Sequence, residues 1–282
     1  MLNKNIETFI GCDKSYNDAK FVLFGVPFDS TTSYRPGARF ASKSIRAESY
    51  AIETYSPYQD KDMSETSIFD AGDLELPIGD TKAVLSKIED FTEQLLHDNK
   101  SPVMIGGEHL VTLPAVQAVF KHYPDLHVIH FDAHADLRDD YLGVKLSHAT
   151  VMRRVWELLG DGRVYQYGIR SGDRSEFIWG SERVYTQKFN FNGIDETIKK
   201  INRKPVYFTL DLDVLDPSIF PGTGTPEAGG VSFNELLDAI KHLSQLNIVG
   251  CDVVELSPTY DPSGVSTAVA CKLLRELLLL LS

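Results

Sequence analysis

Val128-Ile129-His130-Phe131-Asp132-Ala133-His134-Ala135-Asp136 is the stretch of sequence that decides the fold. Its first half is largely apolar, which is typical of a buried β-strand. Its second half places Asp132, His134 and Asp136 at alternate positions, so these side chains share one face if the extended conformation continues. Two carboxylates and an imidazole on one face are costly unless a positive charge lies between them. We therefore expect a divalent metal at this point.

Two further apolar runs end in residues of the same kind. Residues 102–105 lead into Gly106-Gly107-Glu108-His109, and residues 205–210 lead into Asp211-Leu212-Asp213. Any one of these ends, taken alone, also fits a turn or a helix N-cap. The agreement of three strand ends favours one shared metal site over three unrelated turns.

Elsewhere the chain alternates short apolar runs with amphipathic segments. The runs that are short enough for strands lie at residues 21–26, 102–105, 128–131, 164–170, 205–210 and 248–255. The segments with helical spacing lie at residues 41–55, 81–97, 113–121, 193–202 and 233–246. This order predicts an α/β fold in three α-β-α layers with a mostly parallel central sheet. No linker or repeat interrupts it, so we expect a single domain over residues 1–282.

Composition limits the classes of partner. The net charge of −12, from 28 basic and 40 acidic residues, disfavours nucleic acid and anionic membranes and suits a small cationic ligand, although surplus acid also serves solubility. Three scattered cysteines fit a reducing compartment. Residues 1–7 lack a signal-peptide core, and the leucine-rich tail, residues 273–281, is too short to span a bilayer. We expect a cytoplasmic protein with no membrane partner.

The candidate metal ligands outnumber those of a single tetrahedral site. They are His109, Asp132, His134, Asp136, Asp211 and Asp213. Such a set suits two ions that share carboxylates, and its oxygen-rich chemistry favours Mn²⁺. Water between two such ions loses a proton near neutral pH, which makes hydrolysis the natural reaction; a purely structural metal site is the alternative.

These motifs resemble those of a known family. Gly106-Gly107-Glu108-His109, Asp132-Ala133-His134-Ala135-Asp136 and Asp211-Leu212-Asp213 are similar, in order, to the metal motifs of the arginase/agmatinase (ureohydrolase) family. Pro221-Gly222-Thr223-Gly224-Thr225-Pro226-Glu227 resembles a loop of its agmatinase branch. The resemblance implies an arginase/deacetylase-like fold, two Mn²⁺ ions per subunit and a homo-oligomer, either a trimer or a hexamer.

The resemblance also implies a role for each ligand. Asp132 and Asp211 would bridge both ions. His109 and Asp136 would complete one ion, and His134 with Asp213 the other.

Two more residues match the family's substrate site. His148, in Ser147-His148-Ala149-Thr150, matches a histidine that shuttles protons, and Glu255 matches the glutamate that holds a guanidinium. Asp136 would pass a proton to the leaving amine. Ala135 and Ala149 depart from the family's usual residues without removing a ligand. The other histidines are interpreted as packed or surface residues: His97, His122, His127, His130 and His242.

Residues 137–147 decide between substrates. They lack the Asn, Thr and Ser residues that resemblance to arginases would require for binding the α-carboxylate of arginine. Asp139 and Asp140 either offer negative charge to a cationic substrate or are solvated loop residues. We therefore predict hydrolysis of agmatine to putrescine and urea by a hydroxide that bridges two Mn²⁺ ions. The alternative is a related hydrolase of guanidinobutyrate, arginine or formiminoglutamate, for which Arg138 and Lys145 are the basic candidates. A catalytically silent metal-binding protein is a third possibility. The role of residues 28–39, at a neighbour's pocket or a subunit contact, stays open.

Overall fold

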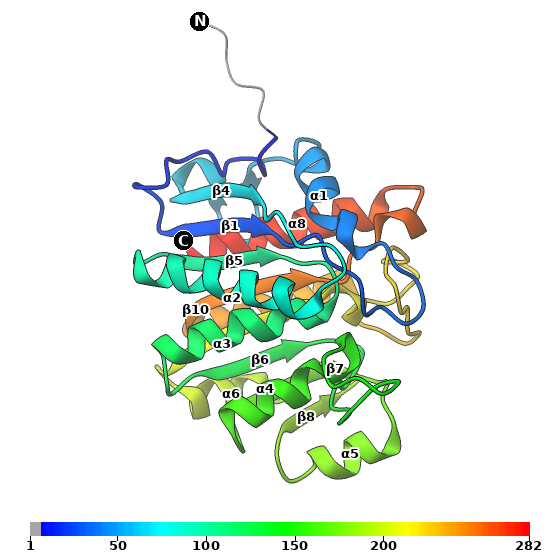
Figure 1. Ribbon diagram of the computed structural model, residues 1–282. Helices are drawn as coiled ribbons and strands as arrows, with labels where there is room; N and C mark the ends of the chain where they lie inside the picture. Colours follow the sequence, from blue (N-terminus) through cyan, green and yellow to red (C-terminus); the bar gives the residue numbers. More distant parts are fainter. Residues whose placement is uncertain (1–6) are drawn as a thin grey trace, which may run out of the picture.

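The computed structural model describes residues 7–282, so the expectation for the first residues of the chain lies largely outside it. An eight-stranded sheet forms the centre, in the order β4-β1-β5-β10-β9-β6-β7-β8, and its neighbouring strands are parallel (Figure 1). Its strands are β1 (Phe21–Gly25), β4 (Ile68–Asp73), β5 (Ser101–Ile105), β6 (His127–Phe131), β7 (Val164–Ile169), β8 (Tyr185–Lys188), β9 (Pro205–Asp211) and β10 (Asn247–Val254). The predicted parallel sheet is confirmed.

Helices cover both faces of this sheet. One layer, in front of the sheet in Figure 1, contains α2 (Thr81–His97), α3 (Thr112–His122) and α4 (Val151–Leu159). The other layer contains α1 (Ala41–Ser49), α6 (Ile194–Ile201), α7 (Phe233–His242) and α8 (Val265–Leu281). The short α5 (Arg174–Gly180) connects β7 to β8 at one edge. The three-layer prediction is therefore confirmed.

The central strands divide their apolar side chains between two cores, as β1 illustrates. In β1, Val22 and Phe24 pack with the layer of α2 and α3, whereas Phe21 and Leu23 pack with the layer of α1 and α8. All four side chains are buried. This burial on both faces explains why the strands read as continuous apolar runs rather than as alternating ones.

One expected helix is shorter than its sequence pattern. Residues 41–55 were expected to be helical, but α1 ends at Ser49 and a small hairpin follows, β2 (Tyr55–Ser56) with β3 (Lys61–Asp62). A long-range contact accounts for the difference: the hydroxyl of Ser56 donates to the buried carboxylate of Glu276 in α8 at 2.7 Å. The leucine-rich tail lies in α8, which packs on α1. Within residues 7–282, no helix is long and apolar enough to cross a membrane.

The arrangement of the sheet brings the candidate residues together. β5, β10, β9 and β6 are neighbours at its centre, and all run in the same direction. In a parallel α/β sheet, ligands bind at the carboxyl ends of the strands. His109, Glu255, Asp211 and Asp132 come at or after the ends of these four strands, at one edge of the molecule.

Candidate functional site

Close packing after β5 delivers His109 to the site. The chain passes so near residue 28 that a Cβ atom at Gly107 would collide with the carbonyl group of Phe28. The amide of Glu108 donates to that same carbonyl oxygen at 2.8 Å. Glycine at this position therefore permits the tight path, and His109 follows with its ring buried.

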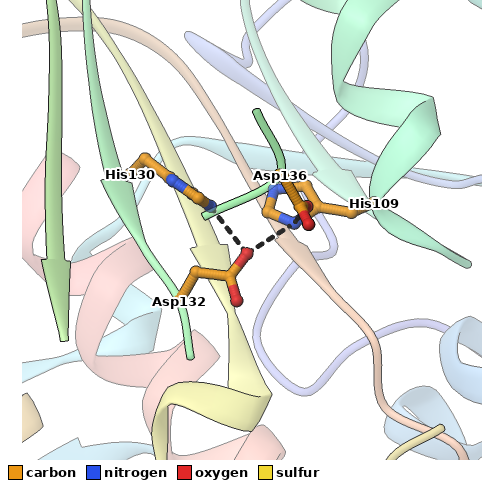
Figure 2. A group of neighbouring side chains, drawn as sticks. All are labelled: His109, His130, Asp132 and Asp136. Atoms are coloured by element: carbon orange, nitrogen blue, oxygen red, sulfur yellow. Dashed lines mark hydrogen bonds and ion pairs between the residues drawn. The ribbon is translucent and has the colours of Figure 1, made fainter. Parts of the chain in front are cut away.

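The imidazole of His109 faces three carboxylates, two of which, those of Asp132 and Asp136, are drawn in Figure 2. Its Nδ1 atom lies 3.0 Å from Oδ2 of Asp132, 3.2 Å from Oδ2 of Asp211 and 3.4 Å from Oδ2 of Asp136. All four side chains are buried. One half of the candidate metal site is therefore built from residues at or just after the ends of β5, β6 and β9.

A second half lies on the other side of Asp132. Nδ1 of His134 is 3.0 Å from Oδ2 of Asp213 and 3.5 Å from Oδ1 of Asp132. The Asp213 carboxylate is held in turn by the amide of Ala133 at 3.1 Å. Asp132 thus presents one oxygen to each half, and the structure brings all six predicted ligands together.

The backbone conformation that places Asp136 in the site differs from the prediction. β6 ends at Phe131, and the backbone of Asp136 has φ = 53°, in the left-handed region. The extended conformation therefore does not continue through residue 136, and simple alternation was the wrong reason for its position. Glu255 has φ = 66°, so two candidate functional residues hold uncommon backbone conformations, as often happens at functional sites.

The electrostatics of the cluster require positive charge. Burial and the charge of Asp132 raise the pKa of Asp136, and burial with the charges of Asp213 and Asp132 raises the pKa of Asp211. Burial would lower the pKa of His109, but hydrogen bonding to Asp132 and Asp211 and their charges raise it. Each change reduces the surplus negative charge, which a bound cation would also do.

Hydrogen bonds behind His109 point its free nitrogen at this cluster. The hydroxyl of Thr209 donates to Oδ1 of Asp252 at 2.6 Å and so accepts from Nε2 of His109 at 2.9 Å. In the neutral form of the ring, the form that can bind a metal, Nδ1 then carries the lone pair, and among residues 7–282 this buried atom has no hydrogen-bond partner. A neutral imidazole with an unpartnered nitrogen aimed at three carboxylates fits a metal ligand.

A cavity of about 180 Å³ opens onto these residues. The predicted substrate residues Glu255 and His148 both line it. Oε1 of Glu255 accepts from the amide of His109 at 2.8 Å, and burial with the charge of Glu108 raises the pKa of Glu255 to about 8. Burial lowers the pKa of His148 to about 4, which leaves that imidazole neutral at pH 7.

The loop of residues 28–39 belongs to this chain's own cavity. Buried Glu108 accepts from the amide and hydroxyl of Thr31 at 3.0 and 2.6 Å and from the hydroxyl of Thr32 at 2.9 Å. The Thr31 hydroxyl also accepts from the amide of His148, and Ser33 approaches Nε2 of His148 at 3.3 Å. Sequence reasoning missed these roles; the only signal was a charged residue next to the His109 motif.

The acidic loop residues do not form the cavity wall. Asp139 is exposed and its carboxylate pairs with Arg154 at 3.1 Å, and neither it nor Asp140 is among the lining residues. Arg138 does line the cavity, but its guanidinium pairs with Asp173 and lies 3.6 Å from Glu176. The interpretation of Asp139 and Asp140 as substrate contacts is therefore not supported.

Comparison with known proteins agrees with this geometry. Residues 19–280 match the model of the arginase family. An agmatinase of Bacillus subtilis is 45% identical over 97% of this chain and 96% of its own. The chain belongs to the arginase family.

Solved structures extend the family assignment to the fold. A candidate agmatinase from Clostridium difficile superposes with a TM-score of 0.93 at 51% identity, covering 95% of this chain and 99% of its own. Agmatine ureohydrolase of Thermoplasma volcanium superposes with a TM-score of 0.90 at 36% identity, covering 99% and 95%. The predicted family, fold and hydrolase class of this arginase-family chain are confirmed.

Proposed function

We propose that this chain, acting as one domain over residues 1–282, hydrolyses agmatine to putrescine and urea. The observation that carries the proposal is the presence of buried Glu255 in the same cavity as four of the six candidate metal ligands. The positive charge of a bound guanidinium favours the ionised form of Glu255, and the carboxylate can then accept two parallel N–H groups from that planar cation. Agmatinases at 45–46% identity over 97% of the chain support this choice of substrate.

The charges around the cavity favour a cationic substrate. Arg138 is the one Lys or Arg side chain among the lining residues, and it already faces Asp173 and Glu176. An acidic substrate would need a basic group that is free to bind its carboxylate, and Arg138 is neutralised. An ammonium group, as at the far end of agmatine, is compatible with this surplus of carboxylates.

The ligand set would hold two Mn²⁺ ions. His109 and Asp136 would bind one ion, His134 and Asp213 the other, with Asp132 and Asp211 shared. Carboxylate-rich ligation suits this metal. When bound, the two ions supply hydroxide near neutral pH by lowering the pKa of water.

The protein groups around the ions perform the remaining steps. Glu255 binds and orients the guanidinium, so that its carbon faces the metal site. Oδ2 of Asp136 lies beside His109 and is placed to hold a proton for the departing amine. Nε2 of His148, close to the Ser33 hydroxyl at the mouth, is neutral at pH 7 and can exchange that proton with solvent.

A panel of guanidino compounds tests the proposal. EDTA-treated protein, reloaded with Mn²⁺, is assayed for urea with agmatine, arginine and guanidinobutyrate, and putrescine is measured in parallel. We expect agmatine to be cleaved with the highest kcat/KM, with one urea per putrescine. Faster urea release from arginine or guanidinobutyrate would refute the substrate assignment, and no release from any compound would refute the enzymatic role.

Membership of the arginase family also motivates two further proposals, one about assembly and one about cellular location. We propose a homo-oligomer, trimeric or hexameric, and a cytoplasmic location. Sedimentation velocity of the purified protein and fractionation of the source cells would test them.

A further inference from the structure

His130 has no part in the proposed reaction, yet it lies against the metal site. Its ring is completely buried, and its Nε2 atom is 2.7 Å from Oδ2 of Asp132, the same oxygen that faces His109 (Figure 2). Neither His130 nor its neighbour Gln166 lines the cavity. Any effect of these side chains on the reaction must therefore pass through Asp132 and the turn that follows it.

The register of three strands aligns a row of polar side chains behind the site. His130 on β6 pairs with Gln166 on β7, and Gln166 pairs with Thr186 on β8. Nε2 of Gln166 is 3.0 Å from Nδ1 of His130, and Oε1 of Gln166 accepts from the Thr186 hydroxyl at 3.0 Å. The row is continuous from Thr186 to Asp132.

One backbone contact assigns every proton in this row. Nε2 of Gln166 also lies 2.7 Å from the carbonyl oxygen of Ala135, which can only accept. The amide group facing that oxygen must therefore be the NH₂ group. Its second hydrogen points at Nδ1 of His130, so Nδ1 must be the bare, accepting nitrogen. The remaining ring proton then sits on Nε2 and is donated to Asp132.

This protonation pattern separates His130 from the metal ligands. A nitrogen that carries a proton cannot ligate a metal, so His130 is no ligand even though its ligand atom lies within 4.8 Å of those of His109, Asp132 and Asp136. Oδ2 of Asp132 accepts this hydrogen bond from His130. Oδ1 of Asp132 accepts a second hydrogen bond, from the amide of His134 at 2.5 Å. The carboxylate is thereby held from both ends, with its other lone pairs free for cations.

We infer that His130 is a positioning residue of the metal centre. Its Nε2 proton, kept in place by Gln166, orients the carboxylate shared by both halves of the site. Gln166 contributes twice, because its bond to the Ala135 carbonyl also supports the turn that carries Asp136. The inference rests on the proposed function only in that it assumes a divalent cation between these carboxylates.

Metal affinity is the direct measure of such a role. Removing a hydrogen-bond partner of a metal ligand weakens metal binding by about 10–100-fold. His130→Phe deletes the donor while keeping a ring, and Gln166→Leu deletes the group that fixes the tautomer. We expect both to weaken Mn²⁺ binding, measured by calorimetric titration of EDTA-treated protein, and His130→Phe to have the larger effect. At saturating Mn²⁺ we expect a lower kcat for agmatine with KM unchanged, because neither residue touches the cavity.

Two controls distinguish positioning from damage to the fold. His127→Phe makes the same change in another buried histidine of β6, whose Nδ1 lies 3.0 Å from the carbonyl of Asp125 away from the site. Thr186→Val removes only the far end of the row. Both are expected to bind Mn²⁺ within about threefold of wild type, well short of the loss that follows removal of a ligand's partner. Wild-type-like Mn²⁺ affinity in folded His130→Phe would overturn the inference, and so would complete loss of one of two bound ions, which would make His130 a ligand.

The tautomer can be read without metal or substrate. Nitrogen-15 spectra of histidine-labelled, metal-free protein should contain one ring with a proton on Nε2 and a bare Nδ1 that disappears in His130→Phe. A proton on Nδ1 of that ring would overturn the inference. If the wild type binds no Mn²⁺, the proposed function fails, while this spectrum still decides the state of His130.

Discussion

Replacing Asp136 by Asn should raise the free energy of unfolding of the metal-free protein. In the presence of Mn²⁺, the same variant should be less stable than the wild type. Ligand atoms of Asp136 and Asp132 lie within 4.8 Å of one another. At an effective dielectric constant of about 20, two unit charges at that distance repel by about 3.5 kcal/mol. Burial and Asp132 raise the pKa of Asp136, so proton uptake relieves part of this repulsion, and we expect a net gain of about 1–3 kcal/mol. Asn tolerates the left-handed backbone of residue 136 as well as Asp does.

Urea unfolding of EDTA-treated and Mn²⁺-loaded protein, at one protein concentration, measures both effects. Because the folded-state pKa of Asp136 is raised, its penalty grows as the pH rises through that value. The advantage of Asp136→Asn should therefore be largest at alkaline pH and vanish in acid. In Mn²⁺ the order should reverse, since the wild type gains about 4.1 kcal/mol at a thousandfold excess over Kd, which exceeds the advantage expected for the variant. A lower unfolding midpoint for Asp136→Asn in EDTA would refute the reasoning. Asp139→Asn, an exposed acid in the same segment, should leave the response to Mn²⁺ intact.

Three further substitutions test other parts of the site. Thr209→Val leaves the Nε2 proton of His109 without its acceptor. We expect the free energy of unfolding in urea to fall by about 1–3 kcal/mol and Mn²⁺ binding, measured by calorimetry, to weaken about 10–100-fold. Unchanged Mn²⁺ affinity would contradict this role of Thr209. Glu255→Gln should lower kcat/KM for agmatine by about 10–100-fold, the value of a charged hydrogen bond, while two Mn²⁺ ions still bind; a normal kcat/KM would exclude Glu255 as the guanidinium site. Burial lowers the pKa of His148 to about 4, so this residue should remove stability as the pH falls from 6.5 towards 4, and His148→Asn should flatten urea-unfolding profiles there; an unchanged profile would count against the lowered pKa.

The ligands were predictable because each follows a local signal. His109, Asp132 and Asp211 come at or just after the end of an apolar run, and parallel strands end at one edge of a sheet. The sequence therefore predicted their convergence without any knowledge of strand order. Glu255 was predictable for the same reason, since it follows β10 directly.

Other parts of the site depend on contacts that no local pattern contains. Glu108 binds Thr31 across a separation of 77 residues, so the role of the loop of residues 28–39 became clear only from the fold. His130 looked like a packed histidine until the strand register placed Gln166 beside it. Asp139 looked available to a substrate until Arg154 was found beside it.

The content of metal per chain tests the central claim most directly. Protein reloaded with Mn²⁺ and freed of excess metal should contain about two ions per chain by mass spectrometry of the metal. Asp132→Asn, which alters the carboxylate that faces both His109 and His134, should bring this content well below that of wild type. Fewer than two ions in the wild type, or two ions retained at full affinity in Asp132→Asn, would contradict a shared two-metal centre.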